Sequence, residues 1–462
     1  MNWHLLINSL LVSGLATLAA AALGFAVAIW LATLGPRWRF RVLALVIASL
    51  ALPPFLVTNT WIDLLGQNGF LHRWLPFNIY SLGGAVWLLA LLTWPLTTVL
   101  TLGAWRKVEA AQMESDPALN GLALIRWLLW PAARQAVMQA AVVTFVLALN
   151  NFSVPVILQV PVFAEELWLA LTARLDEAGA WTATIPLIAV PALVLVALRR
   201  TEFVWPRQMG PATAVALRRQ LGSALHIACA CLGIVLLLLT VGLPATQLGL
   251  SPRTWAELPD LLRASPEVIA NSAFYAAASA TLCAVIGLTM WRVRLGPLLW
   301  LLFLVPGVLL GRGLIFAVNR PGAGVLYGTM AVVLLAFTLR YAALGWSGAR
   351  VAMRGTDRDL TDAVRLEGAS GWTLFRLAEW PQIAPAIMAA WYVVYLLALW
   401  DVETLVLIYP PGGETLALRV FNLLHYGHNA QVNAHCVVLL GLAMAPLAVW
   451  RVATALAERR VE

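Results

Sequence analysis

The sequence predicts an all-α, polytopic membrane protein, and two observations carry that prediction. First, 61% of the 462 residues are hydrophobic and only 11% are charged, about half the charged fraction of a soluble domain. Second, apolar runs recur along the whole chain, and the mean hydropathy is +0.84. In lipid, each run must satisfy its own backbone hydrogen bonds, as a helix does. The composition therefore excludes a single soluble core and makes the lipid bilayer a partner of the chain.

Roughly 20 apolar residues cross a bilayer as a helix, and on that length the sequence predicts about 11 transmembrane helices. Pro53 and Pro54 fall inside the second helix, so we expect a kink or a break there. The expected spans are residues 5–34, 42–65, 83–105, 136–159, 179–198, 221–243, 268–291, 297–319, 325–346, 383–408 and 433–453.

The distribution of basic residues predicts the orientation of the chain. The formal net charge is +8, but the basic residues lie in short clusters between apolar runs, such as Arg37, Arg39 and Arg41. Membrane proteins keep such clusters in the cytoplasm, so we expect the first helix to begin outside and the C-terminus to be cytoplasmic. The same pattern argues against nucleic acid as a partner. The basic residues that this topology leaves elsewhere are Arg73, Arg174, Arg253, Arg263, Arg312, Arg320 and Arg419.

The chain contains an internal repeat with a displacement of 250 residues. The segment LIRWLLWPAARQAVMQAAVVTFVLAL at 124–149 aligns with LFRLAEWPQIAPAIMAAWYVVYLLAL at 374–399, with Arg, Trp, Pro and Met in register. A weaker echo pairs NSLLVSGLATLAAAALG at 8–24 with NSAFYAAASATLCAVIG at 271–287. Six expected helices separate equivalent points, so both repeats run in the same direction through the membrane.

The repeat predicts two parallel halves, residues 1–220 with helices 1–5 and residues 221–462 with helices 6–11. Each half has one long segment that the topology places in the cytoplasm, 106–135 in the first and 355–385 in the second. Parallel halves weigh against carriers built from inverted repeats, but not against carriers with parallel halves.

The second long segment predicts a short amphipathic helix, a break at Gly368, a second short helix and a proline stop before the next span. Glycine takes a positive φ at little cost, and Pro381 suits the first turn of a helix. The segment has the spacing of the cytoplasmic loop of binding-protein-dependent ABC importer permeases. That loop reads Glu-Ala-Ala, three residues, Gly, then nine residues before an ending that closes on Pro. Here Asp362 replaces Glu, Ala363 is kept, and Val364 replaces the second Ala.

The chain thus resembles these permeases, and its two fused halves resemble the ferric-iron and thiamine type. The resemblance implies a translocation pathway for a small solute, such as ferric iron or thiamine, in the bacterial inner membrane. It implies two partners, a periplasmic binding protein and two copies of a separate ATPase subunit on which the loops dock. The implied coupling residues are Asp362, Ala363, Arg365, Glu367, Gly368, Arg376 and Pro381 in the second loop, and Glu109, Ala110, Arg126 and Pro131 in the first.

The first loop departs from the pattern of that family. The distance from Glu109 to Pro131 is three residues longer than the distance from Asp362 to Pro381. Counting back from Pro131, Ala118 stands where the glycine is expected. We therefore expect an altered first coupling site.

The chain lacks a motif for ATP hydrolysis. A phosphate-binding loop needs Gly-Lys-Ser/Thr, and Lys107, between Arg106 and Val108, is the only lysine. The chain is therefore predicted to be a transporter subunit rather than an enzyme, without a cofactor, and any ATP-driven mechanism must recruit a separate ATPase.

Polar and charged groups within or beside the spans have two interpretations. They line a pathway, because such groups in lipid face water or the bundle interior, or they satisfy neighbouring helices. Asn151 and Asp401 are equivalent in the repeat. An ion-coupled secondary carrier using Asp401 and Glu403 is the alternative function, and a non-transporting scaffold is a third. The residues concerned are Asn150, Asn151, Arg312, Arg340, Asp401 and Glu403.

A histidine cluster raises the question of a metal site. His425 and His428 have helical spacing and lie near His435 and Cys436, and such side chains bind transition metals. Histidines at a membrane interface have the same appearance without binding metal, and we predict no metal site.

Overall fold

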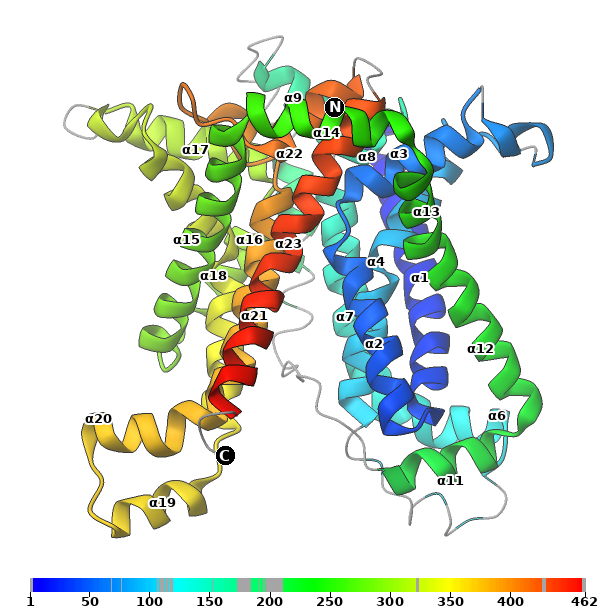
Figure 1. The fold of residues 1–462 in the computed structure, drawn as a ribbon, viewed down its shortest axis with the longest axis vertical. Coiled ribbons are helices and arrows are strands. Elements are labelled where there is room, and N and C mark those ends of the chain that lie inside the picture. The colour runs from blue at the N-terminus through cyan, green and yellow to red at the C-terminus, as the bar shows by residue number, and fades with distance from the viewer. Residues whose placement is uncertain are drawn as a thin grey trace. The chain divides into compact units, whose positions relative to one another are not determined.

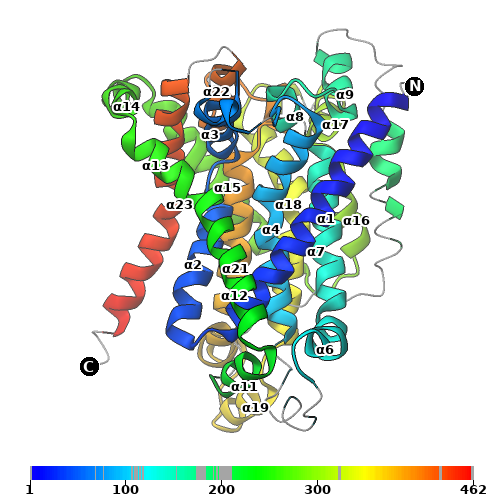
Figure 2. The same cartoon turned by 90° about the vertical axis from the view of Figure 1, so that its right-hand side faces the viewer.

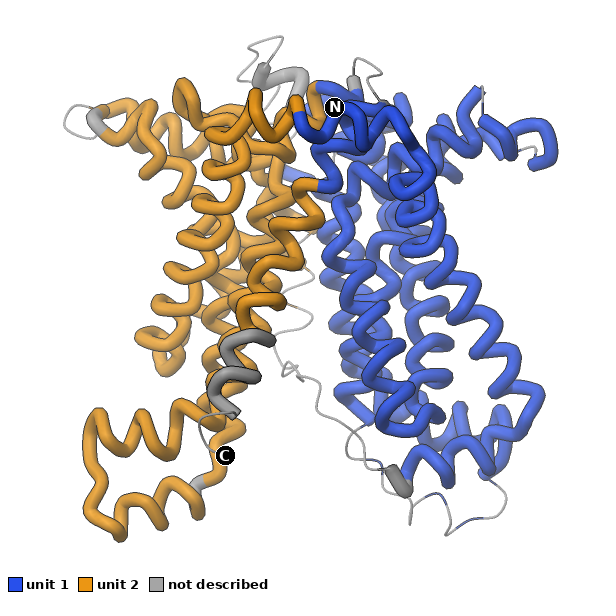
Figure 3. Tube along the Cα trace, in the orientation of Figure 1, with its two compact units in different colours: residues 1–187, 200–259, 423–437 blue, residues 188–199, 260–422, 438–462 orange. Residues whose placement is uncertain are grey.

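The computed structural model describes residues 3–67, 69–75, 77–105, 108, 113, 116, 119–151, 153–172, 184–190, 192–193, 196, 211–320, 324–425 and 429–458. All regular elements within these residues are helices, which confirms the predicted all-α class. The chain forms two compact units, coloured separately in Figure 3. The first unit is residues 1–187, 200–259 and 423–437, and the second is residues 188–199, 260–422 and 438–462.

The helices of the first unit are α1 (Trp3–Thr33), α2 (Pro36–Ala51), α3 (Pro54–Leu65), η1 (Phe70–Arg73), α4 (Leu82–Ala104), α6 (Leu122–Leu124), η3 (Ile125–Leu129), α7 (Trp130–Asn150), α8 (Ser153–Ile157), α9 (Phe163–Thr172), α11 (Pro211–Leu221), α12 (Ser223–Leu237), η4 (Leu238–Gly242) and α13 (Leu243–Leu250).

The helices of the second unit are α15 (Pro266–Met290), α16 (Gly296–Leu304), α17 (Gly307–Val318), η5 (Gly324–Leu326), α18 (Met330–Arg354), α19 (Arg358–Leu366), α20 (Gly371–Leu374), η6 (Phe375–Glu379), α21 (Trp380–Trp400) and η7 (Leu405–Leu407). Three helices continue from one unit into the other: α14 (Pro252–Ala264), α22 (Leu416–His425) and α23 (Asn429–Glu458).

Eight of the described helices are long and apolar enough to cross a membrane. Two sharply bent pairs, α2 with α3 and α16 with α17, raise the number to ten if each pair forms one span. Half of the predicted span 179–198 lies outside the described residues. The prediction of a multi-pass membrane protein is confirmed.

The core of the first unit is a three-helix packing of α1, α4 and α7, in which each helix contacts the other two. Figure 2 shows α1 crossing α4 and α7. Gly24 allows the close approach of α1 and α4, because a Cβ there would lie 2.4 Å from the carbonyl oxygen of Trp94. The hydroxyl of Thr98 donates a hydrogen bond of 2.9 Å to the Gly24 carbonyl, which ties the two helices together at the contact.

The second unit repeats this arrangement with α15, α18 and α21. Gly287 lies at the equivalent contact, where a Cβ would be 2.4 Å from the carbonyl oxygen of Gly345. Gly24 and Gly287 are the last residues of the weaker sequence echo. The echo therefore marks a shared helix contact, since a side chain at either position would force the paired helices apart.

Prolines break both bent pairs. The predicted break at Pro53 and Pro54 is confirmed, because α2 ends at Ala51 and α3 leaves it at 87°. The prediction of one helix over 297–319 was wrong, since α16 and α17 meet at 108°. Pro306 is the N-cap of α17 with an extended ψ of 137°, and the residue before a proline is disfavoured in a helix.

Two predicted helix ends were also too late. Residues 136–159 and 383–408 were expected to be helical, but α7 ends at Asn150 and α21 ends at Trp400. The next residue in each repeat is Asn151 or Asp401. Such side chains bond to nearby backbone groups and so compete with helix continuation.

Candidate functional site

The second loop forms a helical hairpin at one end of the second unit, drawn in yellow-orange in Figure 1. Asp357 caps α19 by accepting a hydrogen bond of 3.0 Å from the Asp359 N–H. The helix ends at Leu366, and Gly368 then has a φ of +90°. This φ favours glycine, so the predicted break at Gly368 is confirmed. Gly371, with a φ of +54°, completes the turn into α20.

The coupling residues predicted in this loop are all exposed. Asp362 and Arg365 form a 2.9 Å ion pair along the surface of α19, a pairing that contributes little stability in water. Two large apolar side chains are also open, Leu366 at 90% and Trp372 at 74% exposure. Such side chains favour a contact surface for another molecule. The exposed predicted residues are Asp362, Ala363, Arg365, Glu367, Gly368, Arg376 and Pro381.

Hydrogen bonds connect this hairpin to the first turn of α21. The Asp357 N–H donates a 2.7 Å bond to Oε1 of Gln382, and the Gln382 amide donates a 2.8 Å bond to the Ala378 carbonyl. Phe375 stacks on Trp372 at 5.4 Å and packs against the buried cluster that contains Ile383. These contacts connect α19 to the base of α21, a long apolar helix.

The predicted proline stop at Pro381 was wrong. The helix passes from α20 through a π-helical turn, η6, into α21 without a break. A proline in a regular helix clashes with the carbonyl four residues earlier, and the wider π turn relieves such crowding. The first repeat has the same π turn, η3, before Pro131. Both π turns are displaced by the same 250 residues, at 125–129 and 375–379.

Gly121 is the site residue that the sequence reasoning missed. It is the repeat equivalent of Gly371, and the two have φ values of +55° and +54°. Gly121 is the N-cap of α6 and Gly371 is the first residue of α20, the short helices that lead into the two π turns. The signal was present in the sequence, because the same displacement of 250 residues aligns the two glycines.

The first loop is partly covered by α11. The Gly121 N–H donates a 2.9 Å hydrogen bond to the Gln220 carbonyl, and the Gln220 side-chain amide donates to the carbonyl of buried Met113. Arg126 is exposed and lies over the Trp127 ring at 5.1 Å. The predicted coupling residue Pro131 is also exposed, whereas Glu109, Ala110 and Ala118 lie outside the described residues.

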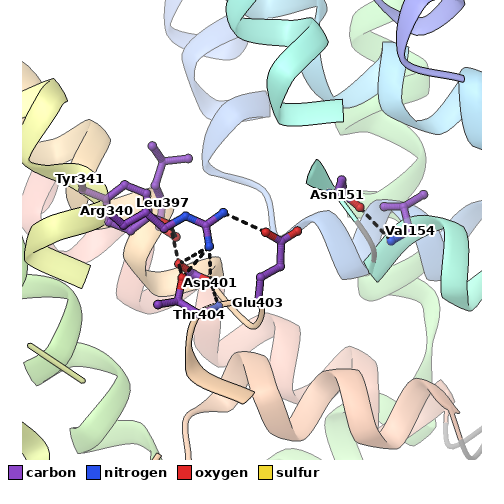
Figure 4. Close-up of polar contacts among 8 residues, drawn as sticks. All are labelled: Asn151, Val154, Arg340, Tyr341, Leu397, Asp401, Glu403 and Thr404. Carbon is purple, nitrogen blue, oxygen red and sulfur yellow. Dashed lines mark hydrogen bonds and ion pairs between the residues drawn. The ribbon is translucent and has the colours of Figure 1, made fainter. Parts of the chain in front are cut away.

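A buried ionic cluster joins α18 to the segment after α21 in the second unit (Figure 4). The Arg340 guanidinium lies 3.2 Å from Oδ2 of Asp401 and 2.8 Å from Oε2 of Glu403. All three residues are less than 10% exposed. Removing one partner from a buried ion pair leaves an uncompensated charge, so the three side chains are energetically coupled.

The Asp401 carboxylate is the centre of this cluster. Besides Arg340, it accepts bonds of 2.9 Å from the Thr404 N–H, 2.7 Å from the Thr404 hydroxyl and 2.7 Å from the Tyr341 hydroxyl. Gly307, the first residue of α17, lies against it, because a Cβ there would be 1.8 Å from Nη1 of Arg340. The cluster therefore fixes the bent helix pair and the end of α21 to one another.

The equivalent position in the first unit keeps the cap and lacks the ion pair. Asn151 accepts a 3.0 Å hydrogen bond from the Val154 N–H through its Oδ1, as Asp401 does from Thr404 (Figure 4). Asn150 is buried at the end of α7. The predicted lining of a pathway by Asn150, Asn151, Asp401 and Glu403 stays a prediction.

Ser9 and Ser272 make the same tertiary hydrogen bond in the two repeats. The Ser9 hydroxyl accepts a 2.7 Å bond from the Phe163 N–H at the start of α9. The Ser272 hydroxyl accepts a 2.8 Å bond from the Leu416 N–H at the start of α22. The asparagine before each serine adds a second hydrogen bond to the same region. The Asn8 side chain donates to the Pro161 carbonyl, and the Asn271 side chain donates to the Gly412 carbonyl. Each Asn-Ser pair thus holds the start of a helix that comes after the last core helix of its repeat, α9 in the first and α22 in the second.

A polar hollow of about 960 Å³ opens on the first unit beside the end of α3. Gln159, on its wall, has a φ of 56°, which is uncommon for a residue other than glycine. Burial first, and the Asp63 carboxylate second, raise the pKa of Tyr80 above its ordinary value, so the phenol stays protonated. Most of the wall comes from the single stretch 62–80, and only Gln159 comes from a distant part of the chain. The polar residues of the wall are Asp63, Gln67, His72, Asn78, Tyr80 and Gln159.

No group of three His, Cys, Asp or Glu side chains lies together as metal ligands within the described part of the chain. The Nδ1–H of His435 donates a 2.7 Å hydrogen bond to the Gln431 carbonyl one helical turn away. His428 and the side chain of His425 lie outside the described residues.

The sequence is similar to several permease proteins of known transport systems. No protein-family model matches the chain. A ferric transport system permease protein of Actinobacillus pleuropneumoniae is 22% identical over a 497-residue alignment, which covers 95% of this chain and 69% of that protein. A putrescine transport system permease protein of Escherichia coli is 32% identical over 89 residues, 19% of this chain and 32% of that protein.

A Salmonella typhimurium protein named as a 2-aminoethylphosphonate transport system permease is 27% identical over 140 residues, 30% of this chain. The chain spans 52% of the length of that relative. All three relatives are permease proteins of transport systems. The resemblance to transporter permeases is therefore confirmed.

Proposed function

We propose that the chain is the permease subunit of an ATP-binding-cassette importer and forms the pathway for a small solute delivered by a periplasmic binding protein. The observation that carries the proposal is the second loop. This loop adjoins the base of α21. It contains the amphipathic helix α19, the positive φ of Gly368, and the exposed side chains of Leu366 and Trp372. That geometry suits a surface that receives force from another subunit.

The proposed coupling residues are those of the second loop, with Gly121, Arg126 and Pro131 in the first. Docking of two ATPase copies, one on each loop, follows from the repeat. The first loop would present a different surface, because α11 covers part of it. The proposed halves, 1–220 and 221–462, follow the sequence repeat, and the bacterial inner membrane with a cytoplasmic C-terminus is the proposed location.

The names of the relatives support a small solute as cargo. They are ferric iron, putrescine and 2-aminoethylphosphonate transport systems, and they share no single chemical class. We therefore propose ferric iron, thiamine or a similar small solute, without choosing among them.

The buried cluster weighs against the secondary-carrier alternative. Asp401 and Glu403 both pair with Arg340, whereas a coupling ion or proton needs a carboxylate that exchanges its partner during transport. The shared cap at Asn151 and Asp401 favours a structural role for the latter.

The test is purification of the tagged chain from its native membrane in mild detergent. A nucleotide-binding subunit should co-purify, and the complex should hydrolyse ATP, while the chain stripped of that subunit should not. Solute uptake that continues after depletion of cytoplasmic ATP, but stops when the proton gradient is dissipated, would establish the carrier instead.

A further inference from the structure

The segment that follows α3 exposes an unusual number of aromatic side chains. Phe70 is 75% exposed and Trp74 is 77% exposed, and Leu75 and Phe77 are also open. No residue of η1 is buried. Water around so much apolar surface costs free energy roughly in proportion to the area, so this surface is expected to have a partner.

The bend of the helix pair sets the direction of this segment. α2 belongs to the bundle, and α3 leaves it at 87°. A helix that turns through a right angle from a membrane-crossing direction runs along the membrane plane. Figure 1 shows the continuation of α3 extending sideways from the end of its unit that is opposite α6.

The second repeat also has a bent helix pair followed by exposed aromatic side chains, although the residues differ. α17 leaves α16 at 108°, and it carries Phe316 at 68% exposure. Arg320 lies over the Phe316 ring at 4.4 Å, and Tyr327 is 50% exposed after η5. This segment lies at the end of the second unit opposite α19 (Figure 1).

Both segments combine aromatic rings with an arginine, Arg73 in one and Arg320 in the other. Aromatic side chains gather at the boundary between lipid and water, and arginine binds phosphate oxygens. The apolar surface also continues into the spans that follow, through Leu82 at the start of α4 and Met330 at the start of α18, both exposed. These arginines are two of the basic residues that the predicted topology leaves outside the cytoplasm.

We propose that two interfacial wings, residues 70–75 with 77 and residues 316–320 with 324–327, bind the phospholipid headgroup layer on the side away from the coupling loops. The aromatic rings enter the upper acyl region, and the arginines pair with lipid phosphates. The wings oppose tilting of the bent helix pairs. This inference requires a membrane protein but not an ATPase partner, so it stands or falls independently of the proposed function.

The test uses an environment-sensitive fluorophore attached to single cysteines. Cys229 and Cys231 are replaced by serine, while buried Cys283 and Cys436 remain. Labels at Trp74→Cys and Phe316→Cys are compared in vesicles of phosphatidylethanolamine and phosphatidylglycerol, with Phe70→Cys as a second site in the first wing. Asp359→Cys on exposed α19 is the aqueous control, and Leu238→Cys on the apolar surface of η4 is the deep control.

The expected result is blue-shifted emission at positions 70, 74 and 316, with quenching by lipid spin-labelled near the headgroup exceeding quenching by lipid spin-labelled near the chain end. Position 359 should show neither, and position 238 should show the reverse preference. Emission at 74 and 316 that matches the aqueous control overturns the proposal. Preference for the chain-end quencher, or an interfacial signal from only one wing, overturns it as well.

Discussion

Asn151 and Asp401 lie 250 residues apart and make the same hydrogen bond, each through Oδ1 to the backbone N–H three residues later. The distances are 3.0 Å and 2.9 Å. Asp401 differs by its charge, which pairs with Arg340. One position of the repeat thus serves as a turn in both units and as an ion-pair partner only in the second.

The buried cluster predicts an unequal response to neutralisation. Arg340→Met leaves Asp401 and Glu403 without their cation and should destabilise the protein by about 3–5 kcal/mol. Asp401→Asn should be milder, because Asn keeps the cap and the Arg340–Glu403 pair stays balanced. Thermal unfolding in detergent measures both. Equal losses of stability for Arg340→Met and Asp401→Asn would contradict the role of Arg340 as the cation shared by both carboxylates.

The two serines predict matched losses in the two units. Ser9→Ala and Ser272→Ala each leave a helix N–H without its acceptor, which costs about 1–3 kcal/mol when buried. Ser13→Ala is the control, since Ser13 is as buried as Ser9 and its hydroxyl has no hydrogen-bond partner among the described residues. It should unfold at the temperature of the unsubstituted protein. If Ser13→Ala lowered the unfolding temperature as much as Ser9→Ala does, the hydrogen bond from the Phe163 N–H to Ser9 would not be the cause of the loss.

Close helix contacts predict strong effects at two glycines. Gly24→Ala and Gly287→Ala each place a Cβ 2.4 Å from a carbonyl oxygen of the facing helix, and overpacking of this kind costs about 1–3 kcal/mol or more. Gly14, also on α1, is the control, because a Cβ there meets no atom within 4 Å. Gly14→Ala should therefore be neutral or slightly stabilising. Expression level and thermal unfolding in detergent check the three variants.

Gly368 gives a prediction for coupling. A Cβ there meets no atom within 4 Å, so Gly368→Val acts only through the positive φ, at roughly 1–2 kcal/mol. The protein should still insert, while ATPase association and solute uptake fall. Gly368→Asn should retain more uptake, because Asn tolerates this conformation better. Normal uptake with Gly368→Val would mean that the coupling turn lies elsewhere.

The orientation predicts which cysteines react with an impermeant reagent. A cysteine replacing Arg365 should be labelled only after the membrane is opened, whereas one replacing Trp255 should be labelled in intact cells. Positive residues between apolar runs carry this prediction. Labelling of position 365 from outside would overturn both the topology and the coupling assignment.

Periodicity and repetition predicted most of the architecture, because both are visible in one dimension. The 250-residue displacement relates the two π turns and the two caps, and the weaker echo relates the paired serines and glycines, but none of these four features was itself predicted. The break at Pro306 was missed, since the proline lies within an apolar run of full span length.

The partner of Asp401 could not be read from the sequence. Arg340 is 61 residues away on another helix, and only the packing of α18 against α21 brings the two side chains together. Long-range polar pairs of this kind leave no local pattern in the sequence. A glycine such as Gly121 does leave one, because the 250-residue displacement aligns it with Gly371.

The π turns at 125–129 and 375–379 have a consequence for insertions and deletions. Each residue of a helix advances the chain by about 100° around the helix axis. Losing one residue from the regular helix between the π turn and Asn151 would therefore rotate the rest of α7 by about 100° and turn core-facing side chains away from α1 and α4. The stretch from Gly371 to Asp401 has the same number of residues. The three extra residues of the first loop lie upstream of Gly121, so they leave the phase of α7 relative to Gly121 unchanged, and the two repeats can differ in length there.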